Sequence, residues 1–155
     1  MQKFAPLKQA EREWIAGKLD GAGALVATFA PEHADGPVTL EALDRAWAGW
    51  LATSPTDVEE INQVINCVGT RFGQFLVDEA GFAWTIATDD AGTELAVRAL
   101  PDRGDVLMCP ANFVAKRWET RETDFLGAGF AAAVSTLREI KADWDRGKKP
   151  WWRFW

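Results

Sequence analysis

The strongest constraint on the fold is a change of hydrophobic period at Gly81. Before it, apolar residues from Val58 to Leu76 recur at steps of one, three or four, the spacing of an amphipathic helix. After it, apolar residues alternate with small or polar ones over residues 82–88, which is typical of a β-strand. Because helix and strand patterns follow one another instead of alternating, the sequence predicts an α+β fold and disfavours a doubly wound parallel sheet.

The predicted sheet is an antiparallel meander of three strands. Strand patterns cover residues 82–88, 94–100 and 106–109, and turn residues at 89–93 and 101–105 separate them. The third strand is expected to stop at Pro110, which cannot donate to a ladder. We therefore expect the helices to pack on one face of a three-stranded sheet.

Four helices are expected around that sheet. The first covers residues 7–19 and is ended or broken by the glycines of residues 20–23. A short helix follows Thr39, which has the side chain of a good N-cap. In the long helix, Thr56 is the expected N-cap and Glu59 completes a capping box, and the helix ends near Asp78.

The last helix runs over residues 124–144 with one apolar face. We expect residues 1–145 to form a single domain and residues 146–155 to form a tail.

Composition excludes several classes of function. The chain has 155 residues, which is typical of one domain, and a formal net charge of −6. That charge argues against a general nucleic-acid-binding surface. One His and two Cys are too few for a multi-His metal site or a structural zinc site, so no metal or cofactor is expected. No apolar signal core or membrane-spanning run is visible, and we expect a cytoplasmic protein with reduced thiols.

Two glycines in the long helix indicate a close contact. Gly69 and Gly73 lie four residues apart on one helix face, and each weakens the helix by about 1 kcal/mol relative to Ala. The spacing predicts the close approach of another backbone at this face.

The centre of the chain resembles a bacterial domain family of unknown function. The likeness covers residues 56–118 and is carried by residues of the long helix, the hairpin and the segment after it: Gly69, Gly73, Trp84, Asp89, Gly92, Thr93, Ala96, Pro110, Lys116 and Arg117. It implies a small α+β module and no reaction, because the family has no established activity.

Two groups of charged residues are candidates for a small-ligand site. Asp89 and Glu94 form an acidic hairpin tip, and paired carboxylates serve acid–base chemistry or bind cations. Lys116 and Arg117 have the chemistry to receive a carboxylate or phosphate. The alternatives are an ordinary turn at the hairpin and pairing of the two basic residues with local acids such as Glu122.

The single His and the two Cys are weaker candidates. His33 lies beside carboxylates in a loop, but nothing near it in sequence supplies a nucleophile. Cys67 is expected in the middle of the long helix, and Cys109 precedes Pro110 with Lys116 and Arg117 further on. Both thiols are read as small buried apolar residues.

The ten C-terminal residues differ in charge from the rest of the chain. Residues 146–155 carry +4 and no acid, and residues 1–145 therefore carry −10. The aromatic and basic side chains of Trp151, Trp152, Arg153 and Trp155 are candidates for binding a partner. The tail either folds back on the acidic body, binds an acidic partner or inserts at an anionic membrane surface.

The favoured function from sequence is a non-catalytic, protein-binding module. Its concrete form is an immunity-type inhibitor whose acidic surface blocks a basic toxin or effector domain, because complementary charge speeds encounter and selects partners. The alternatives are a small-ligand sensor or enzyme that uses Asp89, Glu94, Lys116 and Arg117, and association of the tail with a membrane surface.

Overall fold

The α+β fold is confirmed by the computed structural model, which describes residues 1–147. The elements, in chain order, are β1 (Lys3–Ala5), α1 (Gln9–Phe29), the 3-10 helix η1 (Pro31–His33), α2 (Leu40–Leu51), α3 (Val58–Ala80), β2 (Ala83–Asp89), β3 (Gly92–Ala99), β4 (Val106–Met108), α4 (Pro110–Thr120) and α5 (Leu126–Asp145). Trp151, Trp152, Arg153 and Trp155 of the predicted tail lie outside the described residues. No helix within residues 1–147 has both the length and the apolar character needed to cross a membrane.

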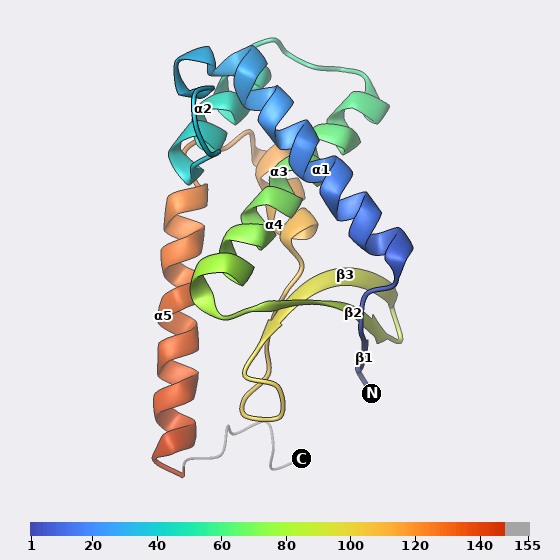
Figure 1. Ribbon diagram of the computed structural model, residues 1–155, viewed down its shortest axis with the longest axis vertical. Helices are drawn as coiled ribbons and strands as arrows, with labels where there is room; N and C mark the ends of the chain where they lie inside the picture. Colours follow the sequence, from blue (N-terminus) through green and yellow to red (C-terminus); the bar gives the residue numbers. More distant parts are fainter. Residues whose placement is uncertain (148–155) are drawn as a thin grey trace.

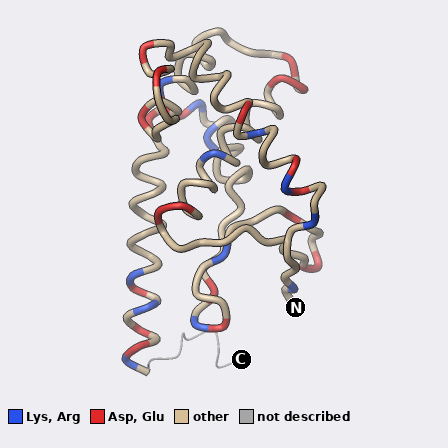
Figure 2. The backbone as a smooth tube through the Cα atoms, in the orientation of Figure 1, with Lys and Arg blue, Asp and Glu red and all other residues tan. Residues whose placement is uncertain are grey.

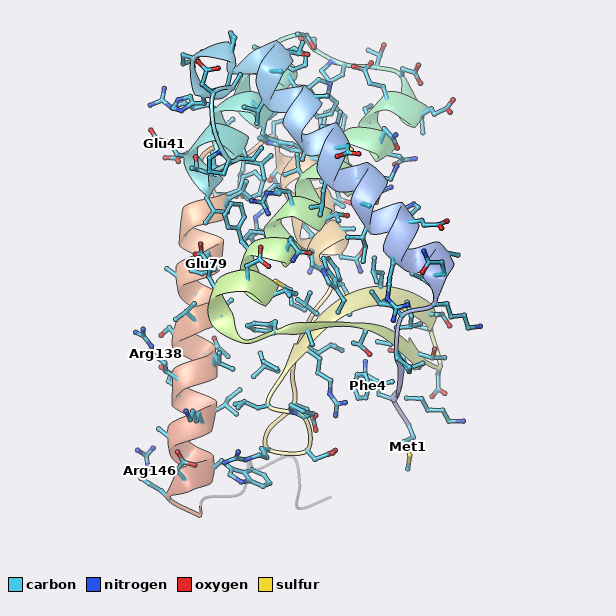
Figure 3. The ribbon with its side chains drawn as sticks, viewed as in Figure 1. Met1, Phe4, Glu41, Glu79, Arg138 and Arg146 are labelled. Atoms are coloured by element: carbon cyan, nitrogen blue, oxygen red, sulfur yellow. The ribbon has the colours of Figure 1, made fainter. Side chains whose placement is uncertain are left out.

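The sheet has four strands, one more than the sequence predicts. Its order is β1-β2-β3-β4 and every neighbouring pair is antiparallel. The additional strand, β1, pairs Ala5 with Ile86, and three residues are too few to show an alternating pattern. Helices α1 to α4 lie above the sheet, and α5 descends along one side (Figure 1). On the far side of the sheet, Phe4 stacks on the Arg98 guanidinium at 3.8 Å (Figure 3).

The first helix does not stop at residues 20–23, as expected, but continues to Phe29. Gly21 faces α3 so closely that a Cβ there would lie 2.5 Å from the Cys67 Sγ. Gly21 therefore serves the packing of α1 on α3, and this tertiary contact overrides its low helix propensity.

The caps of α2 and α3 decide where the two helices begin. Thr39 caps α2 as predicted, and its Oγ1 accepts from the Ala42 N–H at 3.1 Å. The predicted cap of α3 is wrong by one residue, because Asp57 rather than Thr56 accepts from the Glu59 N–H at 2.9 Å. A carboxylate also interacts more favourably than a hydroxyl with the positive end of a helix.

Helix α4 is absent from the sequence prediction, which treats Pro110 only as the end of a strand. Pro110 is instead the first residue of a helix, a position where its missing N–H has no consequence. The predicted close approach at Gly69 is confirmed, because a Cβ there would lie 2.9 Å from the Ala111 Cα. At Gly73 the neighbours are side chains, with the Trp84 ring 2.5 Å and the Pro110 Cγ 2.8 Å from a Cβ.

An aromatic cluster ties α2 to the start of α5. Trp47 and Trp50 are fully buried with ring centroids 5.3 Å apart, and Phe125 packs edge-on to Trp47 at 5.7 Å. The α5 N-terminus has no side-chain cap of its own. The buried Asp44 of α2 accepts from the N–H groups of Phe125 and Leu126, both at 3.1 Å, and so fixes the end of α5 from another helix.

Candidate functional site

Glu94 is the centre of a small polar cluster where α4 begins. Strand β4 ends at Met108, so the edge of β3 beside Glu94 is met by the first turn of α4 instead of by a strand. The Glu94 carboxylate accepts from the Cys109 thiol at 2.9 Å and from the Asn112 amide at 3.2 Å. Sequence reasoning missed Asn112, because its position depends on the unpredicted helix α4.

The environment of Cys109 disfavours its thiolate. Burial, then the hydrogen bond and negative charge of Glu94, and then Asp89 raise the pKa of the Cys109 thiol to about 12. Burial also raises the pKa of the Cys67 thiol. The charge of Lys18 opposes the rise at Cys67 but does not outweigh burial. Because the thiolate is the nucleophilic form, neither environment activates its cysteine.

Asp89 has a structural role in the β2–β3 hairpin. Its carboxylate accepts from the Ala91 N–H at 2.8 Å, which is the local hydrogen bond that Asp makes in tight turns. Asp89 and Glu94 lie close enough to line one small hollow of about 70 Å³ together with Cys109. The structure therefore brings these two predicted residues together, in a hollow whose charged lining residues are both acidic.

Arg117 lies elsewhere, on a different face of α4. Its guanidinium stacks on the Phe113 ring at 4.3 Å and lies 5.9 Å from the Phe125 ring. Its Nε is 3.5 Å from the Glu122 Oε2, and within residues 1–147 this buried Nε has no hydrogen-bond partner. Phe113 and Arg117 are four residues apart, so they lie on the same face of a helix. This spacing would have predicted their contact if α4 had been recognised from the sequence.

Lys116 does not share the surroundings of Arg117. It is exposed, and neighbouring residues of a helix point about 100° apart. Glu94 contacts Asn112, five residues before Arg117, which is about 7 Å along the helix axis. The four charged residues chosen from sequence are thus divided: Asp89 and Glu94 at the hairpin, Arg117 at another face, and Lys116 in solvent.

Arg117 borders a hollow with a volume of about 540 Å³, which we call the Arg117 cleft. It opens between β4, α4 and α5. Its lining comprises Phe82, Val106, Leu107, Met108, Phe113, Arg117, Glu122, Thr123, Asp124, Phe125, Ala128, Gly129, Ala132, Ala133 and Thr136. Most of these side chains are apolar, and Arg117 is the one cation among them.

The α5 wall of the cleft is set back because its residues are small. A Cβ at Gly129 would lie 2.4 Å from the Phe113 ring, so the helix approaches α4 closely at this point. On either side, Ala128 and Ala132 leave space that larger side chains would fill.

His33 has one charged neighbour in the described part of the chain. His33 is half-buried, and its Nε2 lies 3.9 Å from a Glu32 oxygen. Within residues 1–147, no three His, Cys, Asp or Glu side chains are grouped so that they could hold a metal ion.

Negative charge is concentrated at the helical end of the molecule. Residues 20–60, from the second half of α1 to the first turn of α3, contain eight acids and one cation, Arg45, and carry −7. Figure 2 shows these acids at both upper corners of the molecule, where Figure 1 places α2 and the start of α3. We call residues 20–60 the acidic end.

Most of these carboxylates have no Lys or Arg paired with them within residues 1–147. Seven of the eight are exposed: Asp20, Glu32, Asp35, Glu41, Asp57, Glu59 and Glu60. Arg45 pairs with Glu41 at 3.2 Å. Val58, which is 70% exposed, stands among the acids at the start of α3. The acidic end thus presents charge around an exposed apolar side chain, a feature that composition alone does not locate.

Comparison with known proteins gives one family. The family model described as a domain of unknown function, DUF3806, matches residues 48–126, half of the chain. This span includes the 56–118 resemblance and runs from the end of α2 to the first residue of α5. No curated protein and no solved structure matches the chain.

Proposed function

The chain belongs to the DUF3806 family, whose function is unknown, and we propose that it is a non-catalytic protein-binding module whose acidic end receives a basic partner domain. The observation that carries the proposal is the charge of −7 on residues 20–60, of which seven carboxylates are exposed. Such a field attracts a basic partner and raises the rate of association.

The acidic end also has the rigidity and the apolar contact that a binding surface needs. Its helices are fixed by the buried rings of Trp47 and Trp50, so little conformational entropy is lost on binding. Val58 provides an apolar contact surrounded by charge, the common arrangement of a protein interface. In its concrete form, the proposal is an immunity-type inhibitor of a basic toxin or effector domain.

The test compares two charge variants of equal size. The first neutralises three exposed acids of the acidic end: Glu32→Gln, Asp35→Asn and Glu59→Gln. The control neutralises Glu79→Gln, Glu119→Gln and Glu139→Gln, which are exposed on α3, α4 and α5. A protein that co-purifies with the chain at native expression is identified, purified and titrated against both variants over a range of salt concentrations.

We expect a basic partner that loses about tenfold or more in affinity for the first variant, mostly through slower association, and less than threefold for the control. Salt should weaken the wild-type complex. The proposal fails if no protein co-purifies at low salt, if both variants bind equally, or if affinity is independent of salt.

The tail supports a second proposal, association with a membrane surface. Residues 146–155 combine four cations with three Trp, a composition suited to an anionic interface. We expect the full chain to sediment with anionic vesicles and a chain ending at Asp145 to remain in solution. Equal sedimentation of the two chains would remove this proposal.

A further inference from the structure

The Arg117 cleft is not used by the proposed function and has the features of a small-molecule site. Its volume of about 540 Å³ lies within the range of ligand pockets, which are mostly apolar with a few polar groups that orient the ligand. The one cation in its lining is the guanidinium of Arg117. We propose that the Arg117 cleft binds a small monocarboxylate with an apolar tail.

The buried Nε–H of Arg117 has no hydrogen-bond acceptor among the described residues. A buried polar group without a hydrogen bond loses about 1–3 kcal/mol relative to a satisfied one, so such groups are rare in folded proteins. A ligand carboxylate that displaces the Glu122 carboxylate from beside the Arg117 Nε would supply an acceptor, and a guanidinium binds a carboxylate through two parallel N–H groups.

The guanidinium is also held in place before any ligand arrives. It stacks on Phe113 at 4.3 Å, and Phe113 itself stacks on the buried Phe72 at 4.9 Å. The close approach of Gly129 fixes the Phe113 ring from the α5 side. A preorganised cation loses little side-chain entropy when it binds.

Two neighbouring acids restrict the charge of the ligand. Glu122 and Asp124 line the same cleft, and Arg117 is the one cation there. A phosphate monoester, with up to two negative charges, would meet both acids with a single cation to offset them. The ion pair of Arg117 with Glu122 is long at 3.5 Å and the Glu122 side chain is 53% exposed, so a monocarboxylate can displace Glu122 at small loss.

Apart from Thr123 and Thr136, the remaining lining of the cleft is apolar and suits an apolar tail. Met108 of β4 and Ala128 and Ala132 of α5 line the cleft, and none of them carries a hydrogen-bonding side chain that a tail would leave unpaired. Each methylene buried there should raise affinity about fourfold until the space is filled.

The test measures binding of decanoate to the full chain by titration calorimetry, below the concentration at which decanoate forms micelles. Hexanoate, decanol and decyltrimethylammonium serve as probes of tail length and head-group charge. We expect decanoate to bind best. Hexanoate should bind more weakly, by about fourfold for each methylene that decanoate buries and hexanoate lacks. The uncharged and cationic compounds should bind at least about tenfold more weakly than decanoate.

Four variants assign the site. Arg117→Gln should weaken decanoate at least about tenfold, Ala132→Leu should weaken it by filling the cleft, and Glu122→Gln should strengthen it by removing the competing carboxylate. Arg138→Gln is the matched control, because Arg138 lies on α5 and points away from the body of the molecule (Figure 3). It should leave decanoate binding unchanged.

The proposal is overturned if the wild-type chain does not bind decanoate, if decanol binds as tightly, or if Arg138→Gln loses as much affinity as Arg117→Gln. If Arg117→Gln does not fold, the opposite effects expected of Glu122→Gln and Ala132→Leu decide the matter. None of these results depends on the acidic end, so the two proposals stand or fall separately.

Discussion

The acidic end and the α5 side of the molecule bury their aromatic side chains in different ways. In α2, Trp47 and Trp50 are fully buried, and the surface above them carries charge. On the α5 side, Phe113 and Arg117 face small residues such as Ala132, and the surface there is hollow. Side-chain volume therefore decides which kind of site each region presents. The acidic end is filled by large rings and presents a charged surface, whereas the α5 side is lined by small residues and presents a cavity.

The largest effect is expected where packing is tightest. Trp47→Ala removes a fully buried ring that contacts Trp50 and Phe125 and donates from its Nε1 to the Glu122 carbonyl. We expect a loss of about 3–5 kcal/mol in the free energy of unfolding, measured by denaturant titration. Leu137→Ala, on the half-buried face of α5, should lose less than about 2 kcal/mol. Equal losses of stability in the two variants would contradict the proposed difference, because they would mean that the α5 side is packed as tightly as α2.

The contact between α3 and α4 supports the cleft from behind and gives the second prediction. A Cβ at Gly69 would lie 2.9 Å from the Ala111 Cα, which is backbone and cannot turn aside. We expect Gly69→Ala to lower the free energy of unfolding by about 2 kcal/mol despite the better helix propensity of Ala. Gly17→Ala is the control, because nothing lies within 4 Å of the Cβ that the substitution would add. The free energy of unfolding should rise by up to about 1 kcal/mol in this variant. A stabilised Gly69→Ala protein would show that the two helices separate easily.

How much of this could be predicted from sequence depends on the length of each pattern. Helix α3 has an uninterrupted apolar period, and its glycines correctly indicated a close neighbour. Strand β1 is three residues long, and α4 opens with Pro110 directly after a strand, so neither shows a period that can be recognised. The continuation of α1 past Gly21 depends on its contact with α3, which no local signal reports.

The same limit applies to the candidate site. Arg117 could be chosen for its chemistry, and it does border the Arg117 cleft. Its separation from Glu94 could not be foreseen, because it follows from the turns of the unrecognised helix α4. The cleft itself arises where Ala128 and Ala132 of α5 face β4, a meeting of residues far apart in sequence.

Asp44 connects the two regions, and its ionisation gives a prediction for pH. Asp44→Ala removes the acceptor for the N–H groups of Phe125 and Leu126 and should lower the free energy of unfolding by about 1–2 kcal/mol. Burial raises the pKa of the Asp44 carboxyl above its ordinary value, although hydrogen bonds from Leu126 and Phe125 oppose the rise.

A raised pKa means that the folded chain binds the Asp44 proton more readily than the unfolded chain. The contribution of Asp44 to stability is therefore fully present below the ordinary pKa and declines as the pH rises through the raised one. Denaturant titrations of the wild type and Asp44→Asn across this pH range should show the wild type losing stability relative to the variant. If the wild type instead gains stability relative to Asp44→Asn as the pH rises, the hydrogen bonds from the two N–H groups affect the pKa of Asp44 more than its burial does.

The smallest effect is expected at the start of α4, where Glu94 and Cys109 form a satisfied pair. Glu94→Gln removes the negative charge that, after burial, raises the pKa of the Cys109 thiol to about 12. The thiolate fraction at a given alkaline pH should rise, and iodoacetamide should alkylate Cys109 up to about tenfold faster, measured by mass spectrometry of the Cys109 peptide. Asp90→Asn is the control, because Asp90 is exposed on the same hairpin and does not act on Cys109.

An unchanged rate in Glu94→Gln, or an equal rise in Asp90→Asn, would show that burial alone governs the thiol. Faster alkylation of Cys109 in Glu94→Gln alone would show that the Glu94 carboxylate interacts with the thiol, which distinguishes Glu94 from Arg117. Glu94 would already have its hydrogen-bond partners within the chain, whereas the buried Nε of Arg117 has no hydrogen-bond partner among the described residues. Of the two charged groups chosen from sequence, the one left unsatisfied is the one that a ligand can improve.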